Sequence, residues 1–87
     1  MHTVYILRSL KNGSLYVGIT ERLVEERLFE HNNGKTSSIN NRRPYELVYT
    51  EPMDSHALAA KRERFFKSGK GRRVLQNLAK AGWKPAS

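Results

Sequence analysis

The 87-residue sequence contains no cysteine, and its hydrophobic residues never form a long uninterrupted run. Without cysteine, neither a disulfide nor a thiolate metal site can form. No apolar stretch approaches the ~20 residues that cross a membrane, and the N-terminus lacks the pattern of a secretory signal. These absences predict a cytoplasmic protein that does not enter a membrane.

Acidic residues are scarce compared with basic ones. Eight Asp and Glu stand against sixteen Lys and Arg, so the formal net charge is +8 and the pI is about 10.2. In so short a chain, this excess predicts a polyanionic partner, most often nucleic acid. A membrane surface would require a basic amphipathic helix with a large apolar face, and no segment has one. Charge alone also permits a merely soluble basic protein.

Two segments rich in β-branched and aromatic residues, residues 3–7 and 15–20, predict the strands of a hairpin. Between them, Asn12-Gly13 favours a two-residue turn, because both residues tolerate positive φ. Side chains alternate along a strand, so this hairpin has an apolar face for the core and a more polar one. The apolar face carries Val4, Ile6, Leu10, Leu15, Val17 and Ile19, and the other carries Tyr5, Leu7, Ser9, Tyr16, Gly18 and Thr20.

The two-residue turn also predicts the register of the hairpin. It pairs Ile6 with Ile19 and Tyr5 with Thr20. Tyr5 and Tyr16 then share a face, but their α-carbons lie about 13 Å apart. Either the side chains converge on a common ligand or a bulge shifts the register.

The periodicity becomes helical over residues 21–33, with Thr20 as a candidate N-cap and the following Asn-Asn-Gly as a stop. Arg27 and His31 are four residues apart, which places them one turn apart on one stripe of this helix. Residues 35–43 are polar and basic without periodicity, so they predict an exposed loop.

The remaining chain predicts a strand and two helices. Residues 45–50 read as the strand, with Leu47 and Tyr49 on one side. A helix over residues 56–67 is capped by Ser55, a break follows at the two glycines of residues 69–71, and a helix spans residues 72–81. The inward residues of the first helix are Leu58, Phe65 and Phe66. The fold class is therefore α+β, a small three-stranded antiparallel sheet flanked by helices in the order hairpin, helix, strand, helix, helix.

Four features occur in a specific order along the chain. They are Val4-Tyr5-Ile6, Tyr16-Val17-Gly18, the Arg27 and His31 pair, and Glu63 within Ala60-Lys61-Arg62-Glu63. This set resembles the GIY-YIG nuclease domain family over residues 3 to about 75, and in particular its single-domain, stand-alone members. The resemblance implies one nuclease domain over residues 1–87 that binds and cleaves nucleic acid with the help of a divalent metal.

The resemblance assigns Glu63 as the one protein ligand of Mg²⁺ or Mn²⁺. Carboxylate oxygens suit such hard cations, with water and phosphate oxygens completing the coordination shell. A single carboxylate predicts weak metal binding without substrate. The alternative is an ordinary solvated helix glutamate among basic neighbours.

The resemblance makes Tyr5 the candidate general base. Tyr16 would then orient the attacking water or hydrogen-bond the phosphate, and the two tyrosines could exchange roles. A free phenol has a pKa of about 10, so forming its phenolate at neutral pH costs roughly 4 kcal/mol. The cationic surroundings and the metal must supply most of that free energy. A strand tyrosine is otherwise a half-buried packing residue.

Arg27, His31 and Gly18 complete the candidate catalytic site. Arg27 suits a phosphate clamp because a guanidinium can bind two phosphate oxygens at once, although a surface ion pair with a neighbouring glutamate explains it equally well. His31 can donate to the phosphate or protonate the leaving group, or simply interact with the C-terminal end of its helix dipole. Gly18 lets substrate approach the backbone closely.

Basic residues outside this site form candidate tracks for a sugar-phosphate backbone, with solvated surface positions as the alternative. The residues assigned to this role are Lys35, Arg42, Arg43, Lys67, Lys70 and Arg72.

Three functional hypotheses follow. The first is a Mg²⁺- or Mn²⁺-dependent endonuclease that hydrolyses DNA in repair or processing, with either structure-specific or non-sequence-specific cleavage. The second is a non-catalytic nucleic-acid-binding module that keeps the same fold. The third is a nuclease subunit that a protein partner directs to its target.

Overall fold

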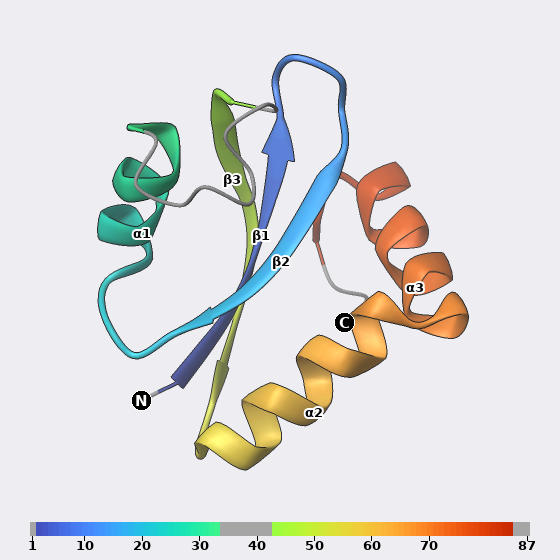
Figure 1. The fold of residues 1–87 in the computed structure, drawn as a ribbon. Coiled ribbons are helices and arrows are strands. Elements are labelled where there is room, and N and C mark those ends of the chain that lie inside the picture. The colour runs from blue at the N-terminus through green and yellow to red at the C-terminus, as the bar shows by residue number, and fades with distance from the viewer. Residues whose placement is uncertain (1, 34–42, 85–87) are drawn as a thin grey trace.

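The computed structural model describes residues 2–33 and 43–84, and the structural statements below concern those residues. They form a three-stranded antiparallel sheet in the order β2-β1-β3 with three helices around it (Figure 1). This arrangement confirms the predicted α+β class. The elements are β1 (His2–Ser9), β2 (Leu15–Thr20), α1 (Val24–Asn32), β3 (Tyr45–Met53), α2 (His56–Lys67) and α3 (Gly69–Lys80).

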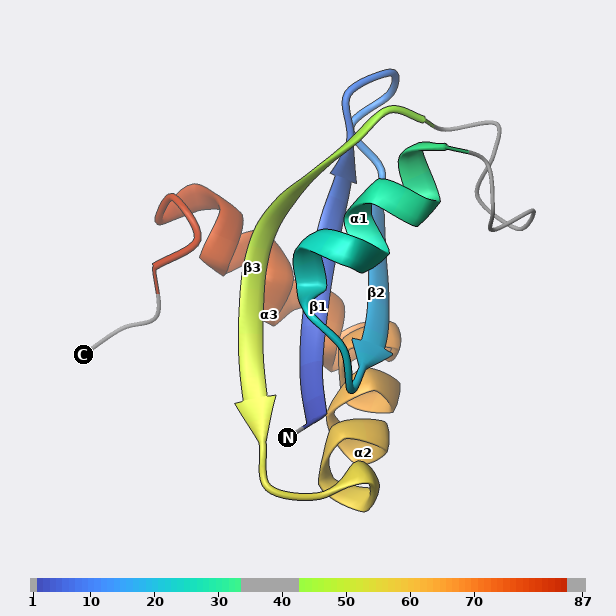
Figure 2. The same ribbon diagram turned by 90° about the vertical axis from the view of Figure 1, so that its left-hand side faces the viewer.

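Helices cover both faces of the sheet. α1 lies on one face, and α2 and α3 lie on the other (Figures 1 and 2). The face under α2 and α3 holds the larger core, as strand alternation predicted, and its buried members are Val4, Ile6, Val17, Ala59, Phe66 and Leu75. The opposite face was expected to be the polar one, yet it forms a second core under α1, whose buried members are Tyr5, Leu7 and Tyr45.

The hairpin register differs from the prediction by two residues. Tyr5 pairs with Gly18 rather than Thr20, because four residues rather than two form the loop. The Ser9 amide donates to the Ser14 carbonyl at 2.8 Å, and the Ser9 hydroxyl accepts from two amides inside the loop. A shift of two keeps each side chain on its predicted face. Leu10 leaves the strand, however, and is 58% exposed rather than part of the core.

A bulge in β3 overturns a second expectation. Ile6 pairs with Tyr49 while the next residue, Leu7, pairs with Leu47, so Val48 is extra on the β3 side. Leu47 therefore packs in the core under α1, and Tyr49 packs in the core under α2 and α3. The prediction that Leu47 and Tyr49 share one side is wrong for this reason.

The start of α1 was also predicted incorrectly. The helix begins at Val24 after an N-cap, Leu23, that makes no side-chain capping bond. Thr20 does not cap the helix, because its hydroxyl accepts from the Arg22 amide at 3.0 Å and turns the chain before the helix starts. At the other end, the Asn32 side chain binds both the amide and the carbonyl of Tyr45, which fastens α1 to the start of β3.

The start of α2 was predicted correctly. The Ser55 hydroxyl accepts from the Leu58 amide at 3.2 Å, as expected of an N-cap. Ala59 and Phe66 are the buried residues of this helix, whereas Leu58, which was predicted to face inward, is 49% exposed.

The break between the last two helices lies at Ser68 rather than at the glycines. Ser68 ends α2 and caps α3 through the Gly71 amide at 3.2 Å. α3 therefore begins at Gly69, three residues earlier than predicted, and both glycines are helical. None of the helices in the described part of the chain has the length and apolarity to cross a lipid bilayer.

Candidate active site

Three aromatic rings meet between the sheet and α1. Tyr5 is fully buried, and its hydroxyl lies 2.9 Å from Nε2 of His31 on α1. The Tyr16 ring packs edge-on against His31 with centroids 5.0 Å apart, and it lies 6.3 Å from the Tyr5 ring. The two tyrosines, predicted to share a face at a distance, are therefore neighbours. The four-residue loop explains the difference, because it moves Tyr16 two positions closer to Tyr5 along the ladder.

Gly18 makes room for the Tyr5 ring. A Cβ atom at this position would lie 2.5 Å from the Tyr5 hydroxyl oxygen and 2.6 Å from Cζ, well inside van der Waals contact. Gly18 is itself buried. The space above it, which the sequence suggested for substrate, is thus filled by the phenol of Tyr5.

Arg27 supplies the positive charge next to this cluster. Burial raises the pKa of the Tyr5 hydroxyl, and the neighbouring Arg27 guanidinium acts in the opposite direction. Arg27 also donates from Nη1 to Oε1 of Glu30 at 2.7 Å, so the ion pair considered from the sequence does form. One side chain therefore contributes both to the ion pair and to the field around the buried phenol.

His31 is buried as a neutral imidazole. Its burial lowers the pKa of the ring, and the charge of Arg27 lowers it further. Nε2 contacts the Tyr5 hydroxyl, while Nδ1 has no hydrogen-bond partner among the described residues. The ring is therefore uncharged at neutral pH and sits behind Tyr16 rather than at the surface.

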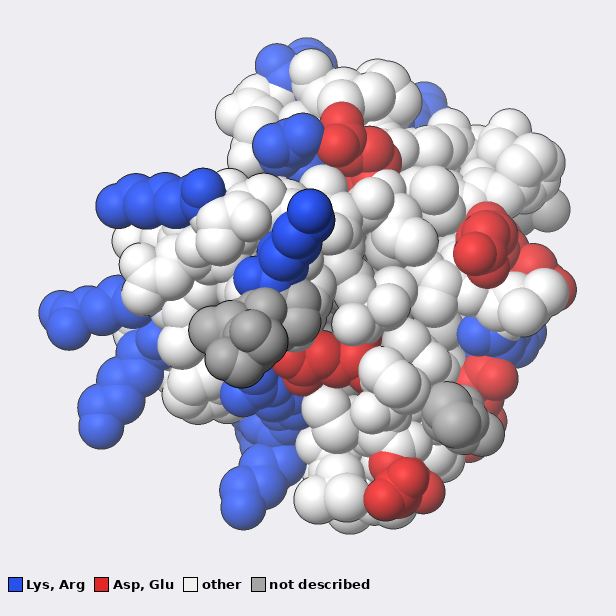
Figure 3. Space-filling view, turned by 180° about the vertical axis from the view of Figure 1, so that it is seen from behind, with Lys and Arg blue, Asp and Glu red and all other residues white. Residues whose placement is uncertain are grey.

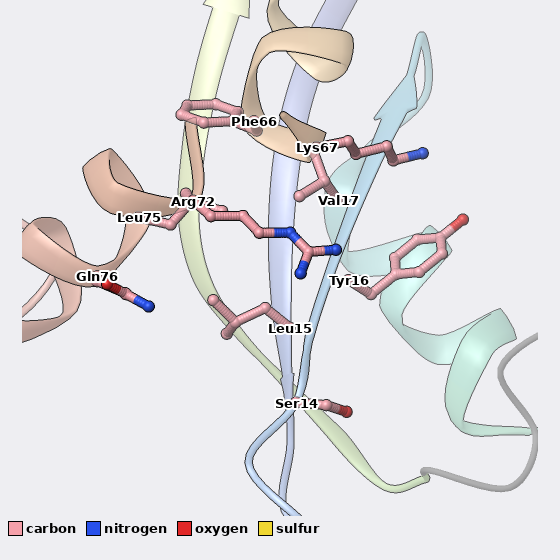
Figure 4. A pocket seen from close by; sticks show the side chains of 9 residues that line it. All are labelled: Ser14, Leu15, Tyr16, Val17, Phe66, Lys67, Arg72, Leu75 and Gln76. Atoms are coloured by element: carbon pink, nitrogen blue, oxygen red, sulfur yellow. The ribbon is translucent and has the colours of Figure 1, made fainter. Parts of the chain in front are cut away.

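A groove of about 590 Å³ runs along the outer edge of β2, where α2 meets α3 (Figure 4). Arg72 and Lys67 extend across it from the two helices, and Tyr16 lies on the strand side. β2 is an edge strand, so this side of it is not covered by another strand of the described sheet. The residues lining the groove are Ser14, Leu15, Tyr16, Val17, Phe66, Lys67, Arg72, Leu75 and Gln76.

Glu63 lies on α2, across the sheet from the buried histidine. Its carboxylate is 3.4 Å from Nζ of Lys67, one turn later, and its side chain is 26% exposed. Lys67 lines the groove together with Tyr16, so it connects Glu63 to the groove. The structure thus gathers Tyr5, Tyr16, Gly18, Arg27 and His31 in one cluster and leaves Glu63 beside the groove, outside that cluster.

A divalent cation fits this donor set only as a weakly held ion. Glu63 offers carboxylate oxygens, which Mg²⁺ and Mn²⁺ prefer. Within residues 2–33 and 43–84, no three His, Asp or Glu side chains group together as metal ligands. A cation at Glu63 would therefore take its other ligands from water and from the phosphate of a bound nucleic acid.

The remaining predicted contact residues are spread over the surface. Lys70 is exposed in the first turn of α3. Arg43 is exposed just before β3, next to the hairpin loop, where the Leu10 amide donates to the Pro44 carbonyl at 2.8 Å. Lys35 and Arg42 lie outside the described residues.

Charge is distributed unevenly over the molecule. Seen from behind, Lys and Arg gather on one side and Asp and Glu on the other (Figure 3). α3 contributes four cations and no acid, whereas α1 carries three glutamates. These residues are Lys70, Arg72, Arg73 and Lys80 on α3, and Glu25, Glu26 and Glu30 on α1.

Sequence reasoning missed Arg22 and Gln76. Arg22 lies in the irregular stretch before α1, where no periodicity assigns a direction to its side chain, yet it binds Glu30 at 2.6 Å. Gln76 lines the groove from α3. Arg72 and Gln76 lie one turn apart in the predicted helix over residues 72–81, but a neutral side chain carries no charge signal that would mark it as part of a binding groove.

The fold and the cluster of tyrosines define a class of nuclease domain. Residues 1–77 match the GIY-YIG catalytic domain, and the chain belongs to this family. Members of the family are typically endonucleases, so membership implies a nuclease-type function that acts on nucleic acid.

Individual relatives are proteins named only UPF0213. One from Staphylococcus saprophyticus is 43% identical over 63 residues, which cover 71% of this chain and 74% of the relative. One from Natronomonas pharaonis is 43% identical over 68 residues, which cover 77% of this chain and 78% of the relative. One from Bacillus licheniformis is 39% identical over 67 residues, which cover 76% of this chain and 67% of the relative. No solved structure matches the chain significantly.

Proposed function

We propose that this protein is a divalent-metal-dependent endonuclease that hydrolyses phosphodiester bonds of DNA during repair or processing, without tight sequence specificity. The observation that carries the proposal is the convergence of Tyr5, Tyr16, His31 and Arg27 around Gly18, beside a basic groove. Family membership supports the nuclease class. The distribution of cations supports a polyanionic substrate.

Tyr16 is the tyrosine that contacts the substrate. The sequence favoured Tyr5 as general base, but Tyr5 is fully buried, whereas Tyr16 is half-buried and lines the groove. A general base must lie within hydrogen-bond reach of the proton it accepts. In this assignment the Tyr16 phenolate accepts a proton from the attacking water as the water oxygen bonds to phosphorus. The bond from phosphorus to the leaving oxygen then breaks, and that oxygen takes a proton from solvent water.

Tyr5 and His31 are positioning residues in this scheme. Their hydrogen bond of 2.9 Å is buried, and the Tyr16 ring rests against the imidazole. A buried neutral imidazole has no route to the leaving oxygen, so His31 does not serve as the acid suggested by the sequence. It instead fixes the orientation of Tyr16 from behind.

Arg27 binds the scissile phosphate. Its side chain is 26% exposed and borders a hollow of the surface, while its other contacts reach Tyr5 and Glu30. A guanidinium remains charged through the reaction and can donate to two phosphate oxygens. It therefore stabilises the negative charge that grows on the phosphate in the transition state.

Glu63 holds the divalent cation. A bound cation would stabilise charge on the phosphate oxygens and lower the pKa of a coordinated water. Lys67, now paired with Glu63, stays next to it in the groove. From there Lys67, Lys70 and Arg72 lie along a track for the nucleic-acid backbone.

The direct test is a cleavage assay with Mn²⁺ on supercoiled, single-stranded and branched DNA. We expect Tyr16→Phe, Arg27→Ala and Glu63→Ala each to lower the rate by about 10²–10³ fold, the usual effect of losing one transition-state contact. Tyr5→Phe should have a smaller effect, because its buried hydroxyl contacts His31 and Arg27 rather than the substrate.

Glu25→Ala serves as the control, since Glu25 is an exposed acid of α1 outside the cluster. It should cut as fast as the parent protein. Equal residual cutting by every variant would identify a contaminating nuclease. No cutting of any DNA by the parent protein would overturn the proposal.

A second candidate function is a binding module that keeps the fold without hydrolysis. The observation that favours it is the single candidate carboxylate, which already forms an ion pair with Lys67. This alternative predicts that Glu63→Ala leaves DNA binding intact and that neither protein cuts. Measuring binding and cleavage on the same preparations separates the two functions.

A further inference from the structure

One carboxylate oxygen on α1 accepts hydrogen bonds from two arginines. Oε1 of Glu30 accepts from Nη2 of Arg22 at 2.6 Å and from Nη1 of Arg27 at 2.7 Å. The Arg22 side chain is 51% exposed, and those of Arg27 and Glu30 are 26% and 25% exposed. Arg22 comes from the irregular segment before the helix, so the shared oxygen brings together two side chains that the local backbone does not align.

This three-residue cluster keeps an excess of one positive charge. The two guanidiniums lower the pKa of the Glu30 carboxyl, so that group remains ionised at neutral pH. Each guanidinium has five N–H donors. Arg22 donates to Glu30, and Arg27 donates to Glu30 and also contacts Tyr5, which leaves donors on both guanidiniums for a further anion.

The two arginines border the same hollow, of about 570 Å³. It lies at the Thr20 end of β2, and Ile19, Glu21 and His56 complete its lining. Glu21, the acid of this lining, has its carboxylate 3.3 Å from Nδ1 of His2. An anion entering the hollow therefore meets two arginine side chains and one acid, Glu21, whose carboxylate lies beside His2.

We propose that Arg22 binds a second phosphate of the nucleic acid, next to the one bound by Arg27, and that Glu30 is the positioning residue that holds the two arginines together. This inference rests on the proposed function. The Glu30 oxygen itself shows that both guanidiniums can donate to a single anionic oxygen. Guanidinium forks match phosphate in the same way.

The position of the hollow also gives the extent of a substrate that reaches from Tyr16 to Thr20 along β2. The hollow borders Thr20 and the basic groove borders Tyr16, four residues apart on β2. That distance is about 13 Å along a strand. At 3.4 Å of rise per nucleotide, a DNA strand that reaches from Tyr16 to Thr20 spans about four nucleotides.

The test measures binding without metal, so that it does not depend on hydrolysis. A fluorescein-labelled DNA duplex is titrated with protein in EDTA at several KCl concentrations, followed by fluorescence anisotropy. Each phosphate contact contributes about 0.9 to the slope of log K against log salt. We expect Arg22→Ala to make the slope shallower by about that amount.

Arg8→Ala is the matched control. Arg8 is also ion-paired with a glutamate, Glu46 at 2.8 Å, and its side chain is 43% exposed, but it borders neither the groove nor the hollow. We expect Arg8→Ala to leave the slope of log K against log salt unchanged. An equal decrease for Arg8→Ala and Arg22→Ala would show a general effect of charge and overturn the assignment. Arg22→Lys keeps the charge without the fork, and we expect it to retain the slope with several-fold weaker binding.

The role of Glu30 has its own test. Glu30→Gln and Glu25→Gln each raise the net charge by one, so general attraction predicts that both bind DNA at least as tightly as the parent. We expect Glu30→Gln to bind several-fold more weakly and Glu25→Gln not to. Equal strengthening by both variants would remove Glu30 from the proposal.

The outcomes also distinguish the two proposals. Suppose that the parent protein binds DNA and Arg22→Ala shows the predicted shallower slope, while no preparation cuts DNA. In that case the proposed hydrolysis is wrong and the phosphate site at Arg22 stands. If it cuts DNA while Arg22→Ala keeps the full slope, the phosphate site is wrong and the nuclease stands. Circular dichroism at each salt concentration verifies that all variants are folded.

Discussion

Tyr5 and Gly18 share one small space at the centre of the candidate site. The phenol of Tyr5 fills the volume where a Gly18 side chain would be, and its hydroxyl then meets His31. Side-chain volume is therefore as important here as chemical identity, because an intruding methyl group would move the ring against which Tyr16 and His31 are placed.

Gly18→Ala tests this close packing. We expect the free energy of unfolding to fall by about 1–3 kcal/mol, the usual cost of overpacking a core. Gly69→Ala is the control, because a Cβ at Gly69 meets no atom within 4 Å and the residue is helical. Urea unfolding measures both variants. Equal stability of Gly18→Ala and the parent would contradict the arrangement of Tyr5 described above.

The buried imidazole of His31 should make stability depend on pH. Its pKa is lowered from 6.5 in the folded chain, so the unfolded chain takes up the proton first as pH falls. Its contribution is complete above about pH 6.5 and decreases as pH falls toward the folded pKa, by at most about 1.4 kcal/mol per pH unit.

Urea unfolding at about pH 7.5 and about pH 5.5 measures this dependence. His31→Gln should show a smaller difference in unfolding free energy between the two pH values than the parent. His56→Gln, which replaces an exposed histidine, should keep the parent's difference. If both variants respond to pH as the parent does, His31 is not the group that titrates.

The sequence predicted the members of the site better than their contacts. Strand alternation placed Tyr5 and Tyr16 on one face, and helical spacing placed Arg27 and His31 on one stripe, and these residues do meet. Their mutual distance depended on the length of a loop, which Asn12-Gly13 alone does not determine. Arg22 escaped prediction because its partner is eight residues away across a break in periodicity.

At the level of elements, the sequence predicted type and order, and the errors lie at junctions. All six elements are present, and the ends of β2 and α2 agree with the prediction. The hairpin loop begins after Ser9, because the Ser9 hydroxyl accepts from two loop amides. These side-chain hydrogen bonds compete with strand pairing, and strand propensity does not reveal them. The bulge at Val48 depends on pairing with β1, which is a long-range property.

The junction of α2 and α3 positions Lys67 and Arg72 over the groove. Ser68 caps α3, and Gly71 packs against the backbone carbonyl of Phe65, where any Cβ would collide. Because backbone cannot move aside as a side chain can, we expect Gly71→Ala to lower the free energy of unfolding by at least about 2–3 kcal/mol.

The same urea experiment compares Gly71→Ala with two other changes at this junction. Ser68→Ala removes only the cap and should cost about 1 kcal/mol. Gly69→Ala should cost nothing, since its Cβ would be in open space. We therefore expect the loss of unfolding free energy to be largest for Gly71→Ala, smaller for Ser68→Ala and absent for Gly69→Ala. A larger loss for Ser68→Ala than for Gly71→Ala would mean that the two helices shift to make room for the added methyl group.

At the level of the whole molecule, the separation of charge orients the protein relative to a polyanion that approaches it. Most cations project on one side of the molecule (Figure 3), where α3 carries four of them, whereas α1 carries three glutamates. A polyanion approaching from solution is attracted to the first side and repelled by the second, an effect that salt screens within about 8–10 Å.

Paired charge reversals test this asymmetry. Lys70→Glu with Arg73→Glu should weaken duplex binding by more than tenfold at low salt and reduce its salt dependence. Arg8→Glu with Lys11→Glu changes the net charge by the same amount at another part of the surface. It should have a smaller effect in the same anisotropy titration. Equal weakening would mean that net charge, and not its placement, controls binding.

The exposed edge of β2 has a consequence for solubility. A strand edge without a partner is a template on which other chains can add strands, and proteins often guard such edges with charge. Lys67 and Arg72 extend across the groove beside this edge. The cations assigned to nucleic acid would then also keep copies of the protein from joining edge to edge, and their neutralisation would favour aggregation.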